Sequence, residues 1–349
     1  MSGGFTAYAS ISTKVGKGLA PGSADKGVAW AATHKLHGVN VSVTIEGGAS
    51  GGVGRAEDGS DAARPSPTLS YARRNGFLKP SENFYGFMDV LPRAGDWGGL
   101  FQDLVAADPH ARRVTVFGEL YGGHYPHPDV PPASPRPSIV QKGVWYHPQV
   151  RFVAFDIRVN DTRYLDLQEA VALFRKFAVP HVQVVFSGPY EDVLAWAQEH
   201  RAAVVDPAWY QCPDLPVLDG NKGEGWVVRP LQELALTWGD RAMYKVKNPD
   251  FNEIVGTGSG SGSGSGTETG RSSGFVSTES VLVTAARVAN VLSKELPDTL
   301  TFANFKKLTE AVVRDAQTEG TSLGIVEDPA TTAKSAGPLV RAYLKSLVE

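Results

Sequence analysis

The chain of 349 residues contains a single cysteine, Cys212. One cysteine excludes a disulfide within the chain and a zinc site built from several cysteines. The sequence has no run of about 18 consecutive apolar residues, which argues against a transmembrane helix, and its first residues lack the basic-then-apolar order of a secretory signal. These absences predict an intracellular, cytoplasmic protein with no membrane partner.

An excess of basic residues is also missing, because the net charge at pH 7 is -3. The chain therefore lacks the overall basic character that marks many nucleic-acid-binding domains. Any affinity for RNA must come from a local cluster of lysine and arginine side chains, and it should weaken as the salt concentration rises.

Glycine and serine dominate one segment, residues 256–274, which reads GTGSGSGSGSGTETGRSSG. This composition cannot bury apolar surface and behaves as a flexible coil. It predicts a first domain over residues 1–253, a linker over 254–275 and a second domain over 276–349.

The first domain has the pattern of an α+β fold. Val39, Val41, Val43 and Ile45 alternate with polar residues, which predicts a strand over 38–46 with one buried face. Further strands are predicted at 69–74, 113–120, 150–159, 182–187, 225–229 and 242–247, helices at 166–178 and 190–201, a mobile loop at 47–67, and irregular proline-rich structure at 122–143. The result is a mainly antiparallel sheet with a few helices.

The second domain has apolar residues at helical spacing. This spacing predicts three helices, over residues 278–295, 301–319 and 335–348. The succession of short strands that marks an oligonucleotide-binding barrel is missing there. We therefore expect a small all-α domain.

Five short segments carry charged and aromatic residues in an order that suits phosphoryl transfer. They are KLHGVN (35–40), FGELYGG (117–123), FVAFDI (152–157), EGWVVRP (224–230) and YKVKN (244–248), with ARRNG (72–76) as an accessory. Lys35 precedes a predicted strand and a glycine, so its amine can project from a loop. Lys245 and Lys247 share one face of a strand, where two ammonium groups repel each other unless an anion such as a phosphate chain lies between them.

These positive surroundings would favour the free amine of Lys35, which is the form that attacks as a nucleophile. Glu119 and Glu224 lie at or near strand ends, where carboxylates can hold a hydrated Mg²⁺ (or Mn²⁺) that also binds substrate phosphates. Phe155 can offer its ring to a base. Together the residues suit a reaction in which positioning and charge neutralisation supply most of the catalysis.

Each residue taken alone has an ordinary explanation. A lone lysine before a strand is usually a solvated surface group, and a phenylalanine such as Phe155 more often belongs to a core. His124 and His127 in HYPHP could ligate a metal, but loop histidines rarely do. The order of the whole set distinguishes this chain from a chance arrangement.

That ordered set resembles the motifs of the covalent nucleotidyltransferases, which include ligases and mRNA-capping enzymes. More narrowly, it is similar to the phage-type RNA ligase 2 family, which includes the kinetoplastid RNA-editing ligases. KLHGVN resembles the nucleophile motif Lys-x-His-Gly-x-Asn of that family, whereas DNA ligases and capping enzymes usually carry aspartate at the position of His37. Residues 283–316 resemble the helical C-terminal domain of the family, and the resemblance implies an ATP-grasp-like ligase domain before it.

The resemblance implies roles in nucleotide binding. Lys35 would form a covalent lysyl-AMP, Phe155 would stack on adenine, and Asn40 would orient the AMP phosphate. Glu119 would engage the ribose or the hydrated metal, and Glu224 would also hold the metal.

It also implies contacts with phosphate and RNA. Lys245 and Lys247 would act on the phosphates as catalytic residues, and Arg74 would contact phosphate. Arg229 would touch phosphate or RNA, and His37 would lie on the RNA side of the site.

The implied function is an ATP-dependent RNA ligase, monomeric, that seals a 3′-hydroxyl to a 5′-phosphate in nicked duplex RNA during RNA repair. One alternative is a DNA ligase or a capping-type enzyme that uses GTP, against which His37 and the helical second domain argue. Another is a non-catalytic RNA-binding relic of the fold, against which the intact set of Lys35, Glu224, Lys245 and Lys247 argues.

Overall fold

The computed structural model of the chain describes residues 4–9, 11, 27–47, 67–135, 137–237, 239–251, 280, 282–323 and 325–347. They belong to two compact units, Met1–Asn248 and Pro249–Glu349. Apart from its first and last residues, the predicted loop 47–67 lies outside the described residues, and so does the whole predicted linker 254–275. None of the helices in the described ranges is both long enough and apolar enough to cross a membrane.

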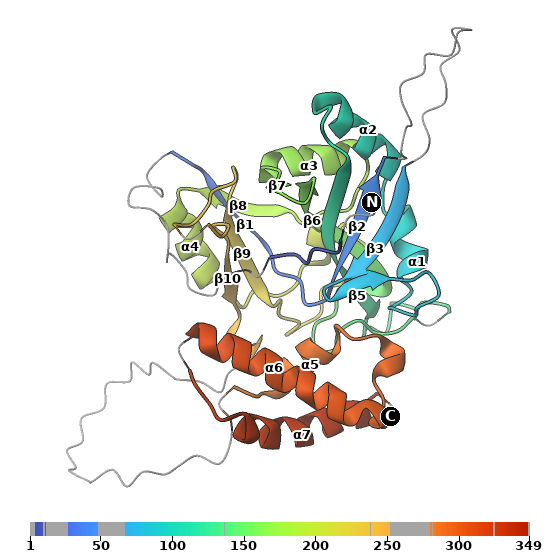
Figure 1. Cartoon of the computed structure of the whole chain (residues 1–349), viewed down its shortest axis with the longest axis vertical. Coiled ribbons are helices and arrows are strands. Elements are labelled where there is room, and N and C mark those ends of the chain that lie inside the picture. The colour runs from blue at the N-terminus through green and yellow to red at the C-terminus, as the bar shows by residue number, and fades with distance from the viewer. Residues whose placement is uncertain are drawn as a thin grey trace, which may run out of the picture. The chain divides into compact units, whose positions relative to one another are not determined.

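Two antiparallel sheets form the first unit (Figure 1). The four-stranded sheet has the order β10 (Tyr244–Lys247), β9 (Gly225–Pro230), β1 (Trp30–His34), β8 (Val184–Gly188). The six-stranded sheet has the order β4 (Gly76–Leu78), β3 (Thr68–Arg73), β2 (Val39–Glu46), β5 (Arg113–His124), β6 (His147–Val159), β7 (Arg163–Tyr164). The predicted α+β class with a mainly antiparallel sheet is confirmed.

The six-stranded sheet buries the apolar face that the alternation on β2 predicted. Val39 lies opposite Leu120 of β5, which lies opposite Phe152 of β6, so these three side chains share one face. Helix α2 (Trp97–Ala107) packs on β2, and the Trp97 ring lies 6.3 Å from that of Phe152. The other face carries the polar pair Asn40 and Glu119, and also Phe117, which is buried in a small apolar cluster with Tyr8.

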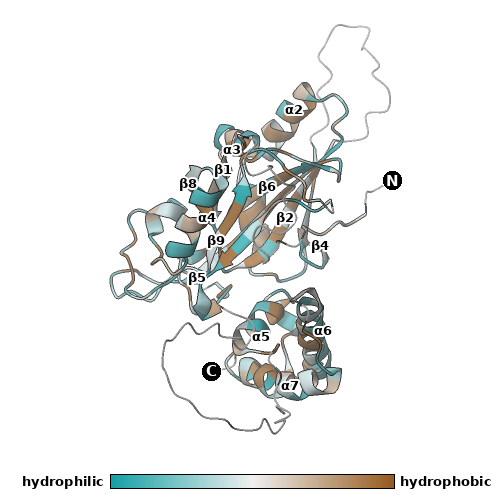
Figure 2. Cartoon of the chain, turned by 90° about the vertical axis from the view of Figure 1, so that its left-hand side faces the viewer, coloured by the Kyte–Doolittle hydropathy of each residue, from teal (hydrophilic) through white to brown (hydrophobic). Residues whose placement is uncertain are grey.

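The four-stranded sheet also has two unlike faces. Trp30, Trp226 and Tyr244 point to one side and pack with helix α4 (Tyr190–Glu199) in a buried apolar cluster. Because alternate side chains on a strand point to opposite faces, Lys245 and Lys247 of β10 lie on the side away from that cluster. Figure 2 shows apolar residues, in brown, along the strands β2 and β6 of the larger sheet.

Shorter elements complete the first unit. They are α1 (Phe87–Val90), α3 (Leu167–Lys176) and the 3₁₀ turns η1 (Leu91–Arg93) and η2 (Pro207–Tyr210). A further 3₁₀ turn, η3 (Pro249–Phe251), begins the second unit. All seven predicted strands and both predicted helices of this domain are present. Strands β1, β4 and β7 and helices α1 and α2 were not predicted.

The described part of the second unit is helical. It contains α5 (Ala285–Leu292), α6 (Phe305–Leu323), α7 (Pro329–Lys345) and the 3₁₀ turns η4 (Pro297–Thr299) and η5 (Phe302–Asn304). Leu292, Val312 and Val340 meet in its buried core. Helix α7 begins six residues before the predicted start, because the Asp328 side chain accepts a hydrogen bond from the Thr331 N–H and proline occupies the first helical position.

The last residue of β1, His34, is buried in an aromatic cage. Its ring lies 4.4 Å from Trp209, 4.6 Å from Trp226 and 5.3 Å from Tyr210. Burial lowers the pKa of His34 to about 3, so the folded protein keeps this imidazole neutral at pH values where the unfolded chain protonates it. The stability that this group contributes is present above pH 6.5 and is lost as the pH falls toward 3.

We predict that His34→Leu removes part of the acid sensitivity of folding. Urea unfolding of the wild type at pH 7 and pH 5 should show a fall in stability that is larger by roughly 2 kcal/mol than the fall in His34→Leu. The matched control is His110→Leu, because His110 is exposed. Equal falls in wild type and His34→Leu would contradict the buried, neutral state of His34.

Candidate active site

Lys35 lies in the short connection between β1 and β2, and backbone bonds fix its position. Its N–H donates to the Gly225 carbonyl at 3.0 Å, which extends the pairing of β1 with β9 by one residue. On the other side of β9, the Asn248 N–H donates to the Glu224 carbonyl at 2.9 Å. The ends of β1, β9 and β10 are thereby aligned, and the side chains that follow or precede them come together.

Three charged side chains meet at this edge. The Lys35 Nζ lies 2.6 Å from Glu224 Oε2, and the Lys247 Nζ lies 3.7 Å from Glu224 Oε1. The imidazole Nδ1 of His37 lies 3.7 Å from Glu224 Oε2. The structure therefore brings together four of the residues that the sequence singled out, from three motifs.

Glu224 is the centre of this group and is only 5% exposed. Its burial alone would raise the pKa of the carboxyl group, but the Lys35 ammonium, the hydrogen bond with His37 and the charge of Lys247 outweigh burial and hold the pKa well below its usual value. The carboxylate is thus ionised at neutral pH.

The charge next to Lys35 is not the one that the sequence suggested. Positive surroundings were expected for its amine, yet its nearest charged partner is the carboxylate of Glu224. The Lys35 ammonium is thus paired with a carboxylate, whose other oxygen lies 3.7 Å from Lys247 Nζ.

Two motif glycines have a physical reason in this geometry. A Cβ on Gly38 would lie 2.3 Å from the Leu120 carbonyl oxygen and 2.7 Å from Glu119 Cγ, so a side chain there would collide with β5. Gly225 has φ of +129° and a Cβ there would lie 2.1 Å from the Val246 carbonyl oxygen. Both glycines permit the close approach that aligns the site.

Two hydrogen bonds with the segment before β6 also fix the loop that contains Lys35. The buried Tyr146 hydroxyl accepts a hydrogen bond of 3.0 Å from the His37 N–H, and Gln141 Nε2 donates to the Gly38 carbonyl at 3.3 Å. Burial raises the pKa of Tyr146; the bond from His37 lowers it, and the charges of Glu224 and Glu119 add to the rise. The Tyr146 hydroxyl is therefore neutral, and both carboxylates lie within electrostatic reach of it.

Asn40 and Glu119 lie beside this group on the six-stranded sheet. They are cross-strand partners on β2 and β5, and Asn40 Nδ2 donates to the Gly118 carbonyl at 3.4 Å. The Glu119 side chain passes over Gly38, three residues after Lys35. Both residues therefore flank the nucleophile candidate, as the sequence led us to expect, and their roles stay predictions.

Phe155 sits at a bulge of β6, between the pairs Gly118–Ala154 and Phe117–Asp156. Its ring lies 5.0 Å from that of Tyr8 at a steep angle, in a small apolar cluster that includes Val227. Val227 of β9 pairs with Lys245 of β10. The half-buried Phe155 ring therefore lies in a cluster next to β10, the strand that carries Lys245 and Lys247. A role in stacking on a base stays a prediction.

Arg229 was expected to touch phosphate or RNA, but its guanidinium is 2% exposed and engaged by the protein. Its Nη2 lies 3.4 Å from Asp156 Oδ1 and 3.0 Å from Glu233 Oε1, and its Nη1 donates to the Phe155 carbonyl at 3.2 Å. This arrangement favours a structural part for Arg229. Its contact with phosphate or RNA stays a prediction.

Asp156 explains why that arginine is drawn inward. The side chain is fully buried, accepts a bond of 2.7 Å from the Tyr8 hydroxyl and pairs with Arg241 Nη1 at 2.6 Å. Burial would raise the pKa of Asp156, and the charges of Arg229 and Arg241 outweigh it, so that the pKa is lowered. A buried carboxylate needs such partners to stay ionised.

Three candidates from the sequence remain: Arg74, His124 and His127. Arg74 occupies the turn between β3 and β4, and its phosphate contact stays a prediction. His124 and His127 belong to no cluster of three or more metal-binding side chains within the part of the chain that the structure describes.

Comparison with known proteins decides the family. The family model described as RNA ligase matches residues 28–247, which is more than half of the chain and reaches from before KLHGVN to Lys247 of YKVKN. The chain belongs to the RNA ligase family.

Among curated RNA ligases, the mitochondrial RNA-editing ligase 2 of Trypanosoma brucei brucei is 29% identical over 220 residues, which cover 57% of this chain and 48% of the relative. The mitochondrial RNA-editing ligase 1 of the same organism is 25% identical over 242 residues, covering 62% of this chain and 46% of the relative. The chain thus spans about half the length of the curated relatives that it matches.

Solved RNA ligase structures are more distant. The Naegleria gruberi RNA ligase with PPi is 17% identical, with a TM-score of 0.41, and covers 72% of this chain and 59% of its own. An archaeal ATP-dependent RNA ligase is also 17% identical, with a TM-score of 0.35, and covers 62% of this chain and 42% of its own.

Sequence reasoning missed two tyrosines that contact candidate residues or their neighbours, Tyr146 and Tyr8. The hydrogen bond of Tyr146 reaches 109 residues back to His37. Tyr8 lies 148 residues before its partner Asp156. No local pattern announces either contact.

We predict that Tyr146→Phe loosens the nucleophile loop while it leaves the aromatic packing in place. The His37 N–H would lose its acceptor, which should cost about 1 kcal/mol of stability and speed hydrogen exchange at that amide. Tyr125→Phe is the matched control, because that hydroxyl bonds to Pro216 instead. Unchanged exchange at His37 in Tyr146→Phe would contradict the assigned bond.

Proposed function

We propose that this chain is an ATP-dependent RNA ligase that joins a 3′-hydroxyl to a 5′-phosphate through a lysyl-AMP on Lys35. The observation that carries the proposal is the meeting of Lys35, Glu224 and Lys247 at one edge of the four-stranded sheet. The family match supports the reaction class, and the geometry supports the choice of nucleophile.

In the first step, the neutral amine of Lys35 attacks the α-phosphorus of ATP. A nitrogen–phosphorus bond forms, the bond from the α-phosphorus to the bridging oxygen breaks, and pyrophosphate leaves with that electron pair. Lys35 must first give its ammonium proton to solvent. A triphosphate that pairs with Lys247 would compete with Glu224 for the Lys247 ammonium. It would also disturb the ion pair between Glu224 and Lys35.

The lysines neutralise charge in that step. Lys247 lies beside Glu224, and Lys245 lies on the same face of β10 two residues earlier. Ammonium groups fixed next to a reacting phosphate stabilise the charge that develops on its oxygens. Phe155 would take the adenine ring, and Asn40 would orient the AMP phosphate.

A divalent metal fits the site as a companion of the nucleotide. Mg²⁺ binds one or two carboxylates together with waters and substrate phosphates, and the described residues offer the pair Glu119 and Glu224 without a larger cage. Glu119 would hold the ion and Glu224 would assist once a lysine has left it. The ion would supply further charge neutralisation at the phosphates.

The later steps move the AMP to RNA and release it. A 5′-phosphate oxygen of RNA attacks the AMP phosphorus and frees Lys35, and a 3′-hydroxyl then attacks the activated 5′-phosphate with loss of AMP. Covalent catalysis divides one difficult joining reaction into easier displacements. The substrate would be a nick in duplex RNA, as in RNA repair, bound by a monomer; the cytoplasmic location stays a prediction.

The direct test is labelling with ATP that carries a radioactive α-phosphate in the presence of Mg²⁺. The wild type should retain label after denaturation, and Lys35→Ala and Lys35→Arg should retain none, because a guanidinium does not give up its proton. Lys176→Ala is the control for loss of a lysine, since Lys176 pairs with Asp103 on the surface. Label that persists in Lys35→Ala would refute the proposal.

The substrate is tested by sealing assays on nicked duplexes. We expect joining when RNA carries the 3′-hydroxyl at the nick, with ATP in preference to GTP. Efficient sealing of an all-DNA nick, or labelling by GTP, would favour the DNA ligase or capping alternative. RNA binding without any protein–AMP adduct would instead favour the non-catalytic alternative.

A further inference from the structure

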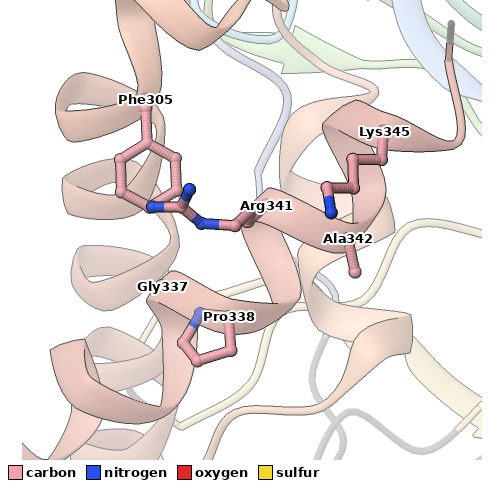
Figure 3. Close-up of a pocket in the computed structure, with 6 residues that line it drawn as sticks. All are labelled: Phe305, Gly337, Pro338, Arg341, Ala342 and Lys345. Carbon is pink, nitrogen blue, oxygen red and sulfur yellow. The ribbon is translucent and has the colours of Figure 1, made fainter.

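The second unit carries a hollow that the proposed chemistry leaves unused. It has a volume of about 420 Å³ and lies between the start of α6 and the second half of α7 (Figure 3). Six residues line it: Phe305, Gly337, Pro338, Arg341, Ala342 and Lys345. We call it the α7 groove.

The α7 groove has a positive lining. Arg341 and Lys345 are exposed, and neither pairs with a carboxylate among the residues that the structure describes. Helix α7 contains no aspartate or glutamate between Pro329 and Lys345. Lys334, Arg341 and Lys345 are spaced by seven and four residues, so they follow one exposed face of the helix.

Two acidic residues of the neighbouring helix α6 are engaged away from this face. Asp315 and Glu319 pair with Arg287, whose side chain is buried, at 2.6 and 3.2 Å. The cationic face of α7 is therefore available to an external anion.

The α7 groove also offers a flat surface. The Arg341 guanidinium lies over the Phe305 ring, 5.1 Å from its centre, and Figure 3 shows the two side chains facing each other from different helices. Gly337 has no side chain, and a Cβ there would come within 3.8 Å of the edge of that ring. A planar group can thus approach the ring and the guanidinium.

We propose that the α7 groove binds a single-stranded stretch of RNA. A base would stack on the Phe305–Arg341 surface, and the neighbouring phosphates would pair with Arg341, Lys345 and Lys334. Aromatic and guanidinium surfaces flanked by lysines are how proteins bind single strands without reading their sequence. An acidic peptide would use the charges but not the ring, so the observations favour RNA.

The inference rests on the proposed function only in that RNA is the proposed substrate. RNA held by the second unit would stay attached while the ends are processed at Lys35, so the α7 groove would act in capture of the substrate. The first step, transfer of AMP to Lys35, needs no RNA. Variants of the α7 groove should therefore label with ATP as the wild type does.

The test measures binding of a fluorescent single-stranded RNA to the full chain in EDTA without ATP, across a series of salt concentrations. Arg341→Ala/Lys345→Ala should weaken binding about tenfold and lower the salt slope by about 1.4, since each lost phosphate contact removes about 0.7. Phe305→Leu should weaken binding about tenfold with an unchanged slope. The control is Arg314→Ala, which removes an exposed arginine from α6 outside the groove and should change affinity less than twofold.

The outcomes separate this inference from the proposed function. A folded double variant, with wild-type helical circular dichroism and wild-type labelling by ATP, that binds RNA with unchanged affinity and slope would overturn the α7 groove but not the ligase. Polyglutamate that binds as tightly as RNA, and loses affinity in the double variant but not in Phe305→Leu, would assign the groove to acidic protein. A chain that never labels with ATP yet binds RNA through these residues would overturn the ligase but not the groove.

Discussion

The contact between Lys35 and Glu224 is the interaction on which the site depends. Glu224 is buried, and a buried carboxylate is stable as an anion only when cations and donors surround it. Lys35 and Lys247 provide the cations and His37 a hydrogen bond, from two other motifs. The backbone bonds of Lys35 to Gly225 and of Asn248 to Glu224 align the strand ends, so the sheet itself positions the group.

The same contact balances the charges of the two lysines. Lys35 and Lys247 share one carboxylate, and each would otherwise repel the other. A triphosphate carries more negative charge than Glu224 and would compete for both lysines. In our account, Glu224 holds the nucleophile in place as a cation. When the nucleotide binds, its phosphates pair with Lys247, and Lys35 gives a proton to solvent before it attacks.

The sequence predicted most of the strands because their apolar residues alternate, as on β2. It missed β1 because all five of its residues are buried and no alternation is visible, and it missed α2 because Gly98 and Gly99 weaken the helical pattern near its start. The order of motifs predicted that Lys35, Glu224 and Lys247 belong to one site. It could not predict the sign of the charge nearest to Lys35, or that Asp156 holds Arg229 inside the fold, because those contacts join residues far apart in the chain.

The central claim is that the Lys35 amine is the atom that accepts AMP. Peptide mapping by mass spectrometry after incubation with ATP and Mg²⁺ tests it most directly. The account predicts an AMP adduct on the peptide that contains Lys35. Acid should release the AMP, because the adduct is a phosphoramidate, and treatment of the protein with pyrophosphate should remove the adduct. An adduct located on Lys245, Lys247 or any other residue, with the Lys35 peptide unmodified, would contradict it.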